Sequence, residues 1–245
     1  MLDNWELRIL HKIKNDTSLE LTLLIKDGRK QTGESTGDRL RKLMRSGNVI
    51  GKILFKAQTV IESKIFKTVN TVNKEEIIAW LNTINSIEVK PDQKGFLDIF
   101  SKADAEIVKS YNLDIILRHE FNIIRGEILN ASKYGIWSFH HGDNSINRGS
   151  PAGFWEVFLK QPVVGVTLQK LTSELDGGFV IDKGYFNRHW SFYKTNKDIH
   201  EDSVSILFKN INKLQLNKLT LGKSPVYFNP LYKYLYLSCK TTNAC

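Results

Sequence analysis

The spacing of hydrophobic positions along the chain changes between a helical and a strand period. Near the N-terminus, Trp5, Ile9 and Ile13 recur on one side of a helix. Residues 19–25 are apolar and β-prone and lead into an Asp-Gly pair, which predicts a strand followed by a turn. By the same criteria we expect further helices at 75–84, 103–110, 154–159 and 198–213, and further strands at 87–89, 113–117, 135–139, 163–171 and 179–186.

The second half of the chain carries the strongest strand signals. Residues 113–117 and 135–139 are nearly continuous apolar runs, as in strands that are covered on both faces. Strands that alternate with helices predict βαβ units and a largely parallel sheet, so we expect an α/β fold. Residues 31–48 are polar and charged, which predicts a loop or a weak helix. We therefore place one α/β domain at residues 1–215 and leave the Tyr-rich tail 216–245 unassigned.

Composition narrows the class of protein. The chain has 245 residues, 41% of them hydrophobic and 25% charged, which suits one folded α/β domain. No apolar run approaches the roughly 20 residues that span a bilayer. The N-terminus lacks the basic start and apolar stretch of a signal peptide, and Cys239 and Cys245 form no disulfide framework or metal spacing. These features predict a cytoplasmic protein.

The chain is basic, with a formal net charge of +9. Such a charge suits nucleic acid, a membrane surface or a phosphorylated substrate. The lysines are scattered and no Arg-rich block occurs, so a solvated lysine-rich surface explains the charge equally well. Binding of nucleic acid is therefore not favoured but stays open, and it would show as a steep salt dependence of RNA affinity.

Candidate chemistry gathers after two predicted strands. His140 and His141 end one of them and are followed by a loop rich in Gly, Asp and Asn. Ligands of α/β sheets bind beyond the carboxyl ends of strands, so reactive side chains are expected there. Asp176 follows the other strand in a Leu-Asp-Gly-Gly turn, whose glycines allow close approach of the backbone to a ligand. A carboxylate beside an imidazole raises its pKa and orients it, which suits proton transfer around a developing oxyanion.

Four short motifs in residues 135–178 stand in one register: His140, Arg148-Gly149, Gly165-Val-Thr and Leu-Asp176-Gly-Gly. This arrangement resembles the folate-dependent formyltransferase family, which includes methionyl-tRNA formyltransferase, glycinamide ribonucleotide transformylase and amino-sugar N-formyltransferases. The resemblance covers residues 100–186 well and the first hundred residues loosely. It implies a Rossmann-type, mostly parallel sheet flanked by helices, with the first strand of the family missing before Trp5.

The chain departs from the family pattern at Ser138, where the family has an asparagine two residues before the histidine. In the family that asparagine helps to hold the formyl oxygen as charge develops on it. A serine is shorter, and loss of one oxyanion donor typically costs ~10²–10³ in rate. Asn122 and Asn144 are candidate substitutes, or else the chemistry differs. The Pro-Ser-Leu-Leu-Pro run of the family is also replaced, by residues 141–145.

The resemblance implies that an amine attacks the formyl carbon of N10-formyltetrahydrofolate. His140 would stabilise the oxyanion, Asp176 would orient His140 and relay a proton through water, and Ser138 completes the predicted catalytic set. Arg148 and Gly149 would bind the substrate, and no metal is implied. The predicted folate-binding residues form two segments, Phe121, Asn122, Ile123, Ile124 and Arg125 in one and Thr172, Ser173, Glu174 and Leu175 in the other.

The acceptor is inferred by elimination within the family. The segment after Phe186 is shorter than the last helix and the tRNA-gripping barrel of methionyl-tRNA formyltransferase require, and the substrate loop of the purine enzyme follows the missing strand. We therefore expect an amine on a phosphorylated or nucleotide-linked amino sugar. Two alternative functions stay open: a methionyl-tRNA formyltransferase-type enzyme, and a formyltransferase-like module of a glycan-assembly protein that is non-catalytic or acts differently. A separate alternative for His141 and Asp143 is a metal site. The oligomeric state is not predicted.

Overall fold

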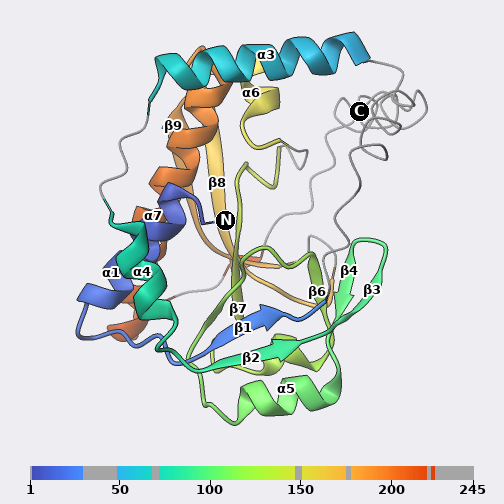
Figure 1. Cartoon of the computed structure of the whole chain (residues 1–245), viewed down its shortest axis with the longest axis vertical. Helices are drawn as coiled ribbons and strands as arrows, with labels where there is room; N and C mark the ends of the chain where they lie inside the picture. Colours follow the sequence, from blue (N-terminus) through green and yellow to red (C-terminus); the bar gives the residue numbers. More distant parts are fainter. Residues whose placement is uncertain are drawn as a thin grey trace.

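Five strands form the main sheet, in the order β10–β9–β8–β7–β5. The computed structural model describes residues 2–29, 49–67, 72–146, 151–174, 178–219 and 222–223 (Figure 1). Only β5 and β7 are parallel, whereas β7/β8, β8/β9 and β9/β10 are antiparallel. The strands are β5 Ile116–Leu117, β7 Ile136–His140, β8 Val163–Lys170, β9 Phe179–Asn187 and β10 Gly222–Lys223.

Two smaller sheets carry more parallel pairs. β1 (Leu24–Asp27) pairs in parallel with β2 (Ser86–Val89). β4 (Leu97–Ile99) is parallel to β6 (Ile123–Arg125) and antiparallel to β3 (Asp92–Lys94). The α/β class and the presence of parallel pairs are thus confirmed. The antiparallel pairs are β7/β8, β8/β9 and β9/β10 in the main sheet and β3/β4 in a smaller one. For β8/β9 the reason is local, because the connection at residues 171–178 is shorter than the roughly twelve residues that a parallel crossover needs.

The helices begin where short polar side chains cap them. Ser101 caps α5, Asn73 caps α4 and Ser191 caps α7, each by accepting a bond from a backbone N–H three residues later. The cap at Ser191 places the start of α7 earlier than predicted, and α3 is a helix that was not predicted from the sequence. The helices are α1 Asn4–Asn15, α3 Val49–Ile65, α4 Lys74–Leu81, α5 Lys102–Lys109, α6 Phe154–Phe158 and α7 Phe192–Gln215, with a 3₁₀ turn at Glu127–Asn130.

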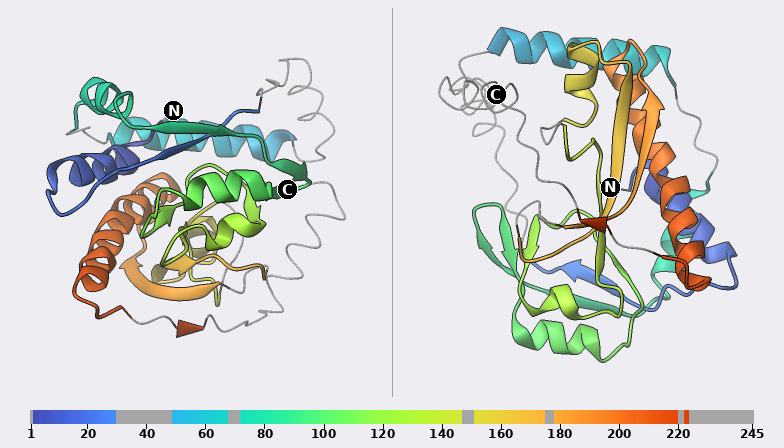
Figure 2. Two further views of the ribbon diagram at one scale, coloured as in Figure 1. Left: turned by 90° about the horizontal axis from the view of Figure 1, so that it is seen from below. Right: turned by 180° about the vertical axis from the view of Figure 1, so that it is seen from behind.

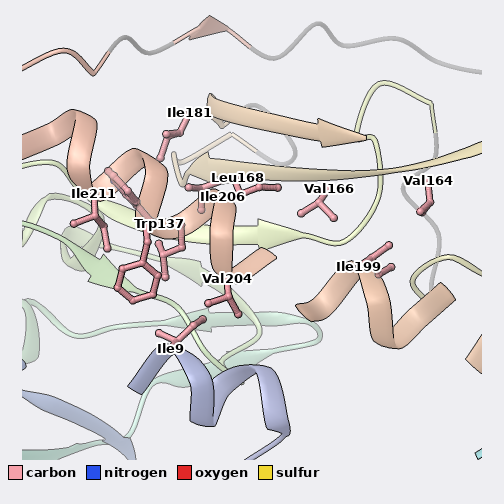
Figure 3. Close-up of a cluster of buried hydrophobic side chains, with 12 residues drawn as sticks. Ile9, Trp137, Val164, Val166, Leu168, Ile181, Ile199, Val204, Ile206 and Ile211 are labelled. Atoms are coloured by element: carbon pink, nitrogen blue, oxygen red, sulfur yellow. The ribbon is translucent and has the colours of Figure 1, made fainter. Parts of the chain in front are cut away.

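Strand β7 separates two hydrophobic clusters. On one side Trp137 packs with residues of β8, β9, α1 and α7, among them Leu168 and Ile199 (Figure 3). On the other side Ile136 packs with residues of β6 and α5, such as Ile124 and Val108. Figures 1 and 2 show α7 lying along the main sheet with α1 beside it, and α5 at the opposite end from α3. Because side chains alternate along a strand, the face of β7 that carries Ile136 also carries the later even-numbered positions.

Among the described residues, no helix is both long enough and apolar enough to cross a membrane.

Candidate active site

His140 is the last residue of β7 and is half-buried. It shares a face of the strand with Ser138, two residues earlier. Its backbone carbonyl accepts a hydrogen bond of 2.9 Å from the N–H of Gly142, which turns the chain sharply after the strand. Across the sheet, His140 is paired with Thr167 of β8. The predicted histidine therefore stands at the carboxyl end of an interior strand, the position at which α/β sheets bind ligands.

A guanidinium lies beside this strand. Arg118 directly follows β5, and its Nη1 donates to the hydroxyl of Ser138 at 3.0 Å. Its Nε donates to the carbonyl oxygens of Phe121 at 2.8 Å and Asn122 at 3.1 Å. Ser138 is only 1% exposed. Burial lowers the pKa of Arg118 while the charge of Asp98 raises it, and an arginine pKa is far enough above neutrality for the group to stay cationic.

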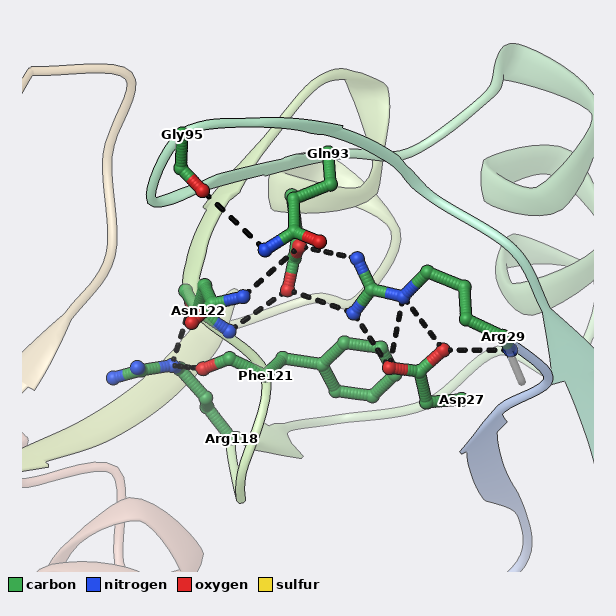
Figure 4. Close-up of polar contacts among 8 residues, drawn as sticks. Asp27, Arg29, Gln93, Gly95, Arg118, Phe121 and Asn122 are labelled. Carbon is green, nitrogen blue, oxygen red and sulfur yellow. Dashed lines mark hydrogen bonds and ion pairs between the residues drawn. The ribbon is translucent and has the colours of Figure 1, made fainter. Parts of the chain in front are cut away.

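Asp98 links this guanidinium site to β1 and β6. Its fully buried carboxylate accepts bonds from Arg29 at 2.6 and 3.2 Å, and from the backbone and side-chain N–H groups of Asn122 at 2.8 and 3.3 Å (Figure 4). Arg29 also binds Asp27. Burial alone would raise the pKa of Asp98, but the hydrogen bonds from Arg29 and Asn122 outweigh it and hold the pKa below its usual value. We call Asp27, Arg29, Asp98, Asn122 and Arg118 the Asp98 network.

The structure brings the two predicted folate segments next to each other. Arg125, at the end of β6, reaches across with Nη1 to the carbonyl oxygen of Thr172, a long contact of 3.5 Å. Phe121 packs on Phe100, with ring centroids 5.3 Å apart, and Ile124 is buried in the core. The buried hydroxyl of Thr172 has no hydrogen-bond partner within the described part of the chain. Ile123 lies in β6 between these residues, and Ser173 and Glu174 are exposed.

The loop after His140 is held by a second buried carboxylate. Asp143 is 6% exposed and accepts bonds from Lys183 Nζ and Tyr185 OH, both at 2.6 Å, and from the backbone and hydroxyl of Ser145 at 2.9 and 2.5 Å. Burial would raise the pKa of Asp143, but these bonds hold it well below its usual range, and the bond to Asp143 raises the pKa of Tyr185 to about 12. Both carboxylate oxygens of Asp143 thus accept hydrogen bonds from other side chains. The geometry therefore does not favour the alternative in which Asp143 and His141 bind a metal.

The Gly-Val-Thr motif of β8 supports the same loop. A Cβ added to Gly165 would lie 2.8 Å from the backbone nitrogen of Asp143, too close for any other residue to fit without a shift. Thr167 is fully buried and donates its hydroxyl to the carbonyl of Gly142 at 3.1 Å. The motif therefore fixes the loop that follows His140. We call Asp143, Ser145, Lys183 and Tyr185 the Asp143 cluster.

His141 lies away from this chemistry, among aromatic rings of α1 and α7. Its ring centroid is 3.9 Å from that of His200 and 5.4 Å from that of Trp5. Burial, together with the charges of His200 and His140, holds the pKa of His141 well below its usual value, and burial also lowers the pKa of His200. Within the described residues, Nε2 of His141 is buried without a hydrogen-bond partner. His141 is thus a neutral packing residue.

Asp176, Arg148, Gly149 and Leu175 lie outside the described residues, so the pairing of His140 with Asp176 stays a prediction. Arg118 and four partners of the two buried carboxylates, Arg29, Ser145, Lys183 and Tyr185, were not among the predicted site residues, whereas Asn122, the other partner of Asp98, was. One signal could have found Arg118, because it directly follows the apolar run 113–117 at the end of a predicted strand.

Neither protein-family models nor curated protein sequences give a match to the chain. Among solved structures, glycinamide ribonucleotide transformylase 1 from Symbiobacterium toebii is similar at 14% identity, over 83% of this chain and 93% of that one, with a TM-score of 0.50. A sugar N-formyltransferase from a Shewanella species matches at 16% identity, over 85% and 75%, with a TM-score of 0.49. HypX from Aquifex aeolicus matches at 16%, over 61% of this chain but only 25% of its own, with a TM-score of 0.46. The likeness shows a formyltransferase-like fold.

Proposed function

We propose that this protein is an N-formyltransferase that moves a formyl group from N10-formyltetrahydrofolate to an amine. The observation that carries the proposal is the guanidinium of Arg118, held on Ser138 two residues before His140. Ser138 stands where the resembled family has an asparagine that holds the formyl oxygen. The chain thus retains a hydrogen-bond donor at that point of the site, although the side chain that supplies it belongs to Arg118, which directly follows the neighbouring strand β5.

Formyl transfer places negative charge on the formyl oxygen when the amine adds to the carbon. A fixed N–H donor beside that oxygen lowers the barrier because it needs no reorganisation. Ser138 is too buried to contact a bound formyl group itself, so we assign it the positioning of Arg118. Arg118 supplies a permanent positive charge and N–H groups in a half-buried site, where charge is screened less than in water. The guanidinium therefore replaces the asparagine as an oxyanion donor.

His140 and Asp176 complete the proposed chemistry. His140 donates an N–H to the developing oxyanion, and Asp176 orients its ring and accepts, through water, the proton that the attacking amine releases. The folate supplies the formyl group and, at N10, the leaving nitrogen that must be protonated when its bond to carbon breaks. The proton taken up by Asp176 can return to that nitrogen, so that the transfer needs no other acid or base.

The residues around β6 fit a folate. The buried hydroxyl of Thr172, which has no partner among the described residues, and the backbone of residues 121–125 offer polar groups to a pterin edge, and Phe121 offers an apolar face. We propose that the two segments, residues 121–125 and residues 172–175, hold the donor. For the acceptor we propose an amine on a phosphorylated or nucleotide-linked amino sugar, which the net charge of +9 and the predicted contacts of Arg148 and Gly149 favour.

Calorimetry with 5-formyltetrahydrofolate tests the proposal first. We expect micromolar binding by the unaltered chain, loss of affinity in Thr172→Val, and binding little changed in His140→Ala. His140→Ala should then abolish formyl transfer in a screen of amino-sugar nucleotides with N10-formyltetrahydrofolate. His11→Ala is the matched control, because His11 is exposed on α1. Absence of folate binding, or full turnover in His140→Ala, would overturn the assignment.

A further inference from the structure

Helix α3 presents an apolar face to the outside of the protein. Six of its aliphatic side chains are between 47% and 74% exposed. The helical period places positions 50, 53 and 54 on the same side as positions 60, 61 and 65, so they form one stripe along the helix. Scattered exposed aliphatic residues are ordinary, but a contiguous stripe usually marks a surface that contacts something else. The stripe consists of Ile50, Ile53, Leu54, Val60, Ile61 and Ile65.

The opposite face of α3 is fixed to the protein by polar contacts. The buried carboxylate of Glu62 accepts bonds from the hydroxyl of Ser191 at 2.7 Å and from the backbone N–H of Tyr193 at 2.9 Å. These groups form the N-terminus of α7, where a carboxylate is favoured. Gln58 donates to the other oxygen of Glu62 at 2.9 Å. These bonds set the rotation of α3 about its axis, so the outward position of the apolar stripe is built into the fold.

The exposed charge on α3 has a single sign. Its only acidic residue is Glu62, which is buried and bonded to α7, whereas Lys56 and Lys64 are exposed and Lys52 is half-buried. A second copy packed on this stripe would bring the lysines of two helices together without a carboxylate of α3 between them. An anionic partner would complement both the charge and the apolar stripe.

The position of α3 suits a broad, flat partner. The helix runs along one end of the molecule, where Figures 1 and 2 show it crossing over α6 and α7. Two exposed aromatic residues belong to segments that pack near this helix. The ring centroid of Trp190 lies 5.7 Å from that of Phe66, which directly follows α3. Phe158 stacks on Phe154, whose ring contacts Phe55 of α3. Tryptophan is enriched at the boundary between lipid and water, and phenylalanine occurs on the apolar face of elements that lie in this boundary.

We propose that α3 docks the protein on an anionic lipid bilayer. The helix lies in the plane of the interface, with its stripe among the acyl chains just below the headgroups and Lys56 and Lys64 against anionic headgroups. The docking does not depend on formyl transfer, because no residue of the candidate active site belongs to α3. It would keep the enzyme at a surface while leaving His140 and the folate segments free.

Sedimentation with vesicles tests this docking on the full chain. The vesicles contain phosphatidylcholine alone or phosphatidylcholine with about one third phosphatidylserine. We expect binding to the anionic vesicles only, weakening as salt rises. Leu54→Ser with Ile61→Ser should weaken binding ~50-fold, since each buried carbon group contributes to insertion. Lys56→Gln and Lys64→Gln should each weaken it about fivefold, and they leave the stripe intact.

The matched control replaces exposed isoleucines elsewhere, Ile78→Ser in α4 with Ile107→Ser in α5. These changes should leave vesicle binding unaltered. Circular dichroism verifies that each variant keeps its fold. Three outcomes would overturn the proposal: no binding to anionic vesicles, equal binding by the α3 variant and the control, or self-association in analytical ultracentrifugation that Leu54→Ser with Ile61→Ser abolishes without any vesicle binding.

Discussion

Asp98 and Asp143 are both buried carboxylates held ionised by hydrogen bonds, yet they connect different parts of the molecule. Asp98 lies on β4 and binds Arg29, which follows β1, and Asn122, which precedes β6. Asp143 binds two residues of one strand, Lys183 and Tyr185 of β9. The first carboxylate therefore joins separate sheets, and the second fixes one loop on one sheet. Burial alone does not tell these roles apart, whereas the distribution of partners does.

The largest effect is expected at Asp98. Asp98→Ala leaves the guanidinium of Arg29 and the N–H groups of Asn122 without their shared acceptor, which should lower the free energy of unfolding by about 3–5 kcal/mol. Urea denaturation measures this change. Asp27→Ala is the control, because Asp27 binds the same arginine from a more exposed position and should cost about 1 kcal/mol or less. Equal costs in the two variants would remove Asp98 as a link between the sheets.

The next largest effect is expected at Arg118, on the rate of formyl transfer rather than on stability. Arg118→Gln should lower kcat for formyl transfer by ~10²–10³, because one charged oxyanion donor is lost. Steady-state kinetics with N10-formyltetrahydrofolate provides kcat, and calorimetry provides folate affinity separately. The separation matters because Arg118 also binds the carbonyl groups of Phe121 and Asn122 in the folate segment.

Arg118→Lys and Ser138→Ala serve as graded controls for this prediction. Lysine keeps the charge but cannot reproduce the fork of N–H bonds, so activity should be intermediate. Ser138→Ala removes one anchor of the guanidinium and should cost less in kcat than loss of the guanidinium itself. If Arg118→Gln weakens folate binding without changing kcat, Arg118 only shapes the folate segment.

Elements whose pattern is local could be predicted from the sequence. The helix at α5 and the strand at β7 follow from apolar spacing, and the fold class follows from their alternation. The antiparallel pairing of β7, β8 and β9 did not follow, because apolar runs show that strands are buried but not in which direction they pair. Helix α3 went unassigned, and helical spacing alone would not have shown whether its apolar side faces the protein or the outside.

The site divides in the same way. The position of His140 at the end of a buried strand could be predicted from the apolar run before it. The Arg118–Ser138 bond could not, because a long side chain can reach many acceptors and only the folded backbone selects one. Lys183 and Asp143 are likewise far apart in the chain and meet only after β9 pairs with β8. Long-range polar contacts are thus the part that a single sequence does not specify.

The Asp143 cluster should show a moderate effect confined to its loop. Asp143→Asn weakens the bonds to Lys183 and Tyr185 and should lower the free energy of unfolding by about 1.5–3 kcal/mol. The pKa of Tyr185 should fall from about 12 towards 10, its usual value, which NMR of labelled tyrosine can follow. We also expect kcat to fall, because the loop begins next to His140.

Ser145→Ala provides the comparison for Asp143→Asn. It removes a neutral donor and leaves the carboxylate in place, so it should cost only about 1 kcal/mol and keep the raised pKa of Tyr185. An unchanged pKa of Tyr185 in Asp143→Asn would contradict the direct bond. A stability loss as large as that of Asp98→Ala would contradict the distinction between the two carboxylates.

The smallest effect is expected on the other face of β7, in the pH dependence of stability. The pKa values of His141 and His200 are lower in the folded protein than the usual 6.5, so the unfolded chain binds protons first as pH falls. The contribution of these two histidines to the free energy of unfolding is complete above about pH 6.5. Below that pH it is lost, by at most about 1.4 kcal/mol per pH unit for each histidine. Asp98 and Asp143 have lowered pKa values, so their contribution is lost only below about pH 4. A loss of stability between pH 6.5 and pH 5 therefore reports the two histidines, and a loss below pH 4 reports the two carboxylates.

His141→Phe should flatten the loss of stability between pH 6.5 and pH 5, measured by urea denaturation at each pH. Phenylalanine retains a ring against Trp5 and His200, and the stability difference at pH 8, where the imidazoles are neutral, measures the packing change alone. Charges around the pair act in both directions, since Lys197 lowers the pKa of His200 and Asp3 and Glu201 raise it. An identical slope between pH 6.5 and pH 5 in His141→Phe would show that the ring of His141 does not titrate there, and would leave His200 as the source of the loss in that range.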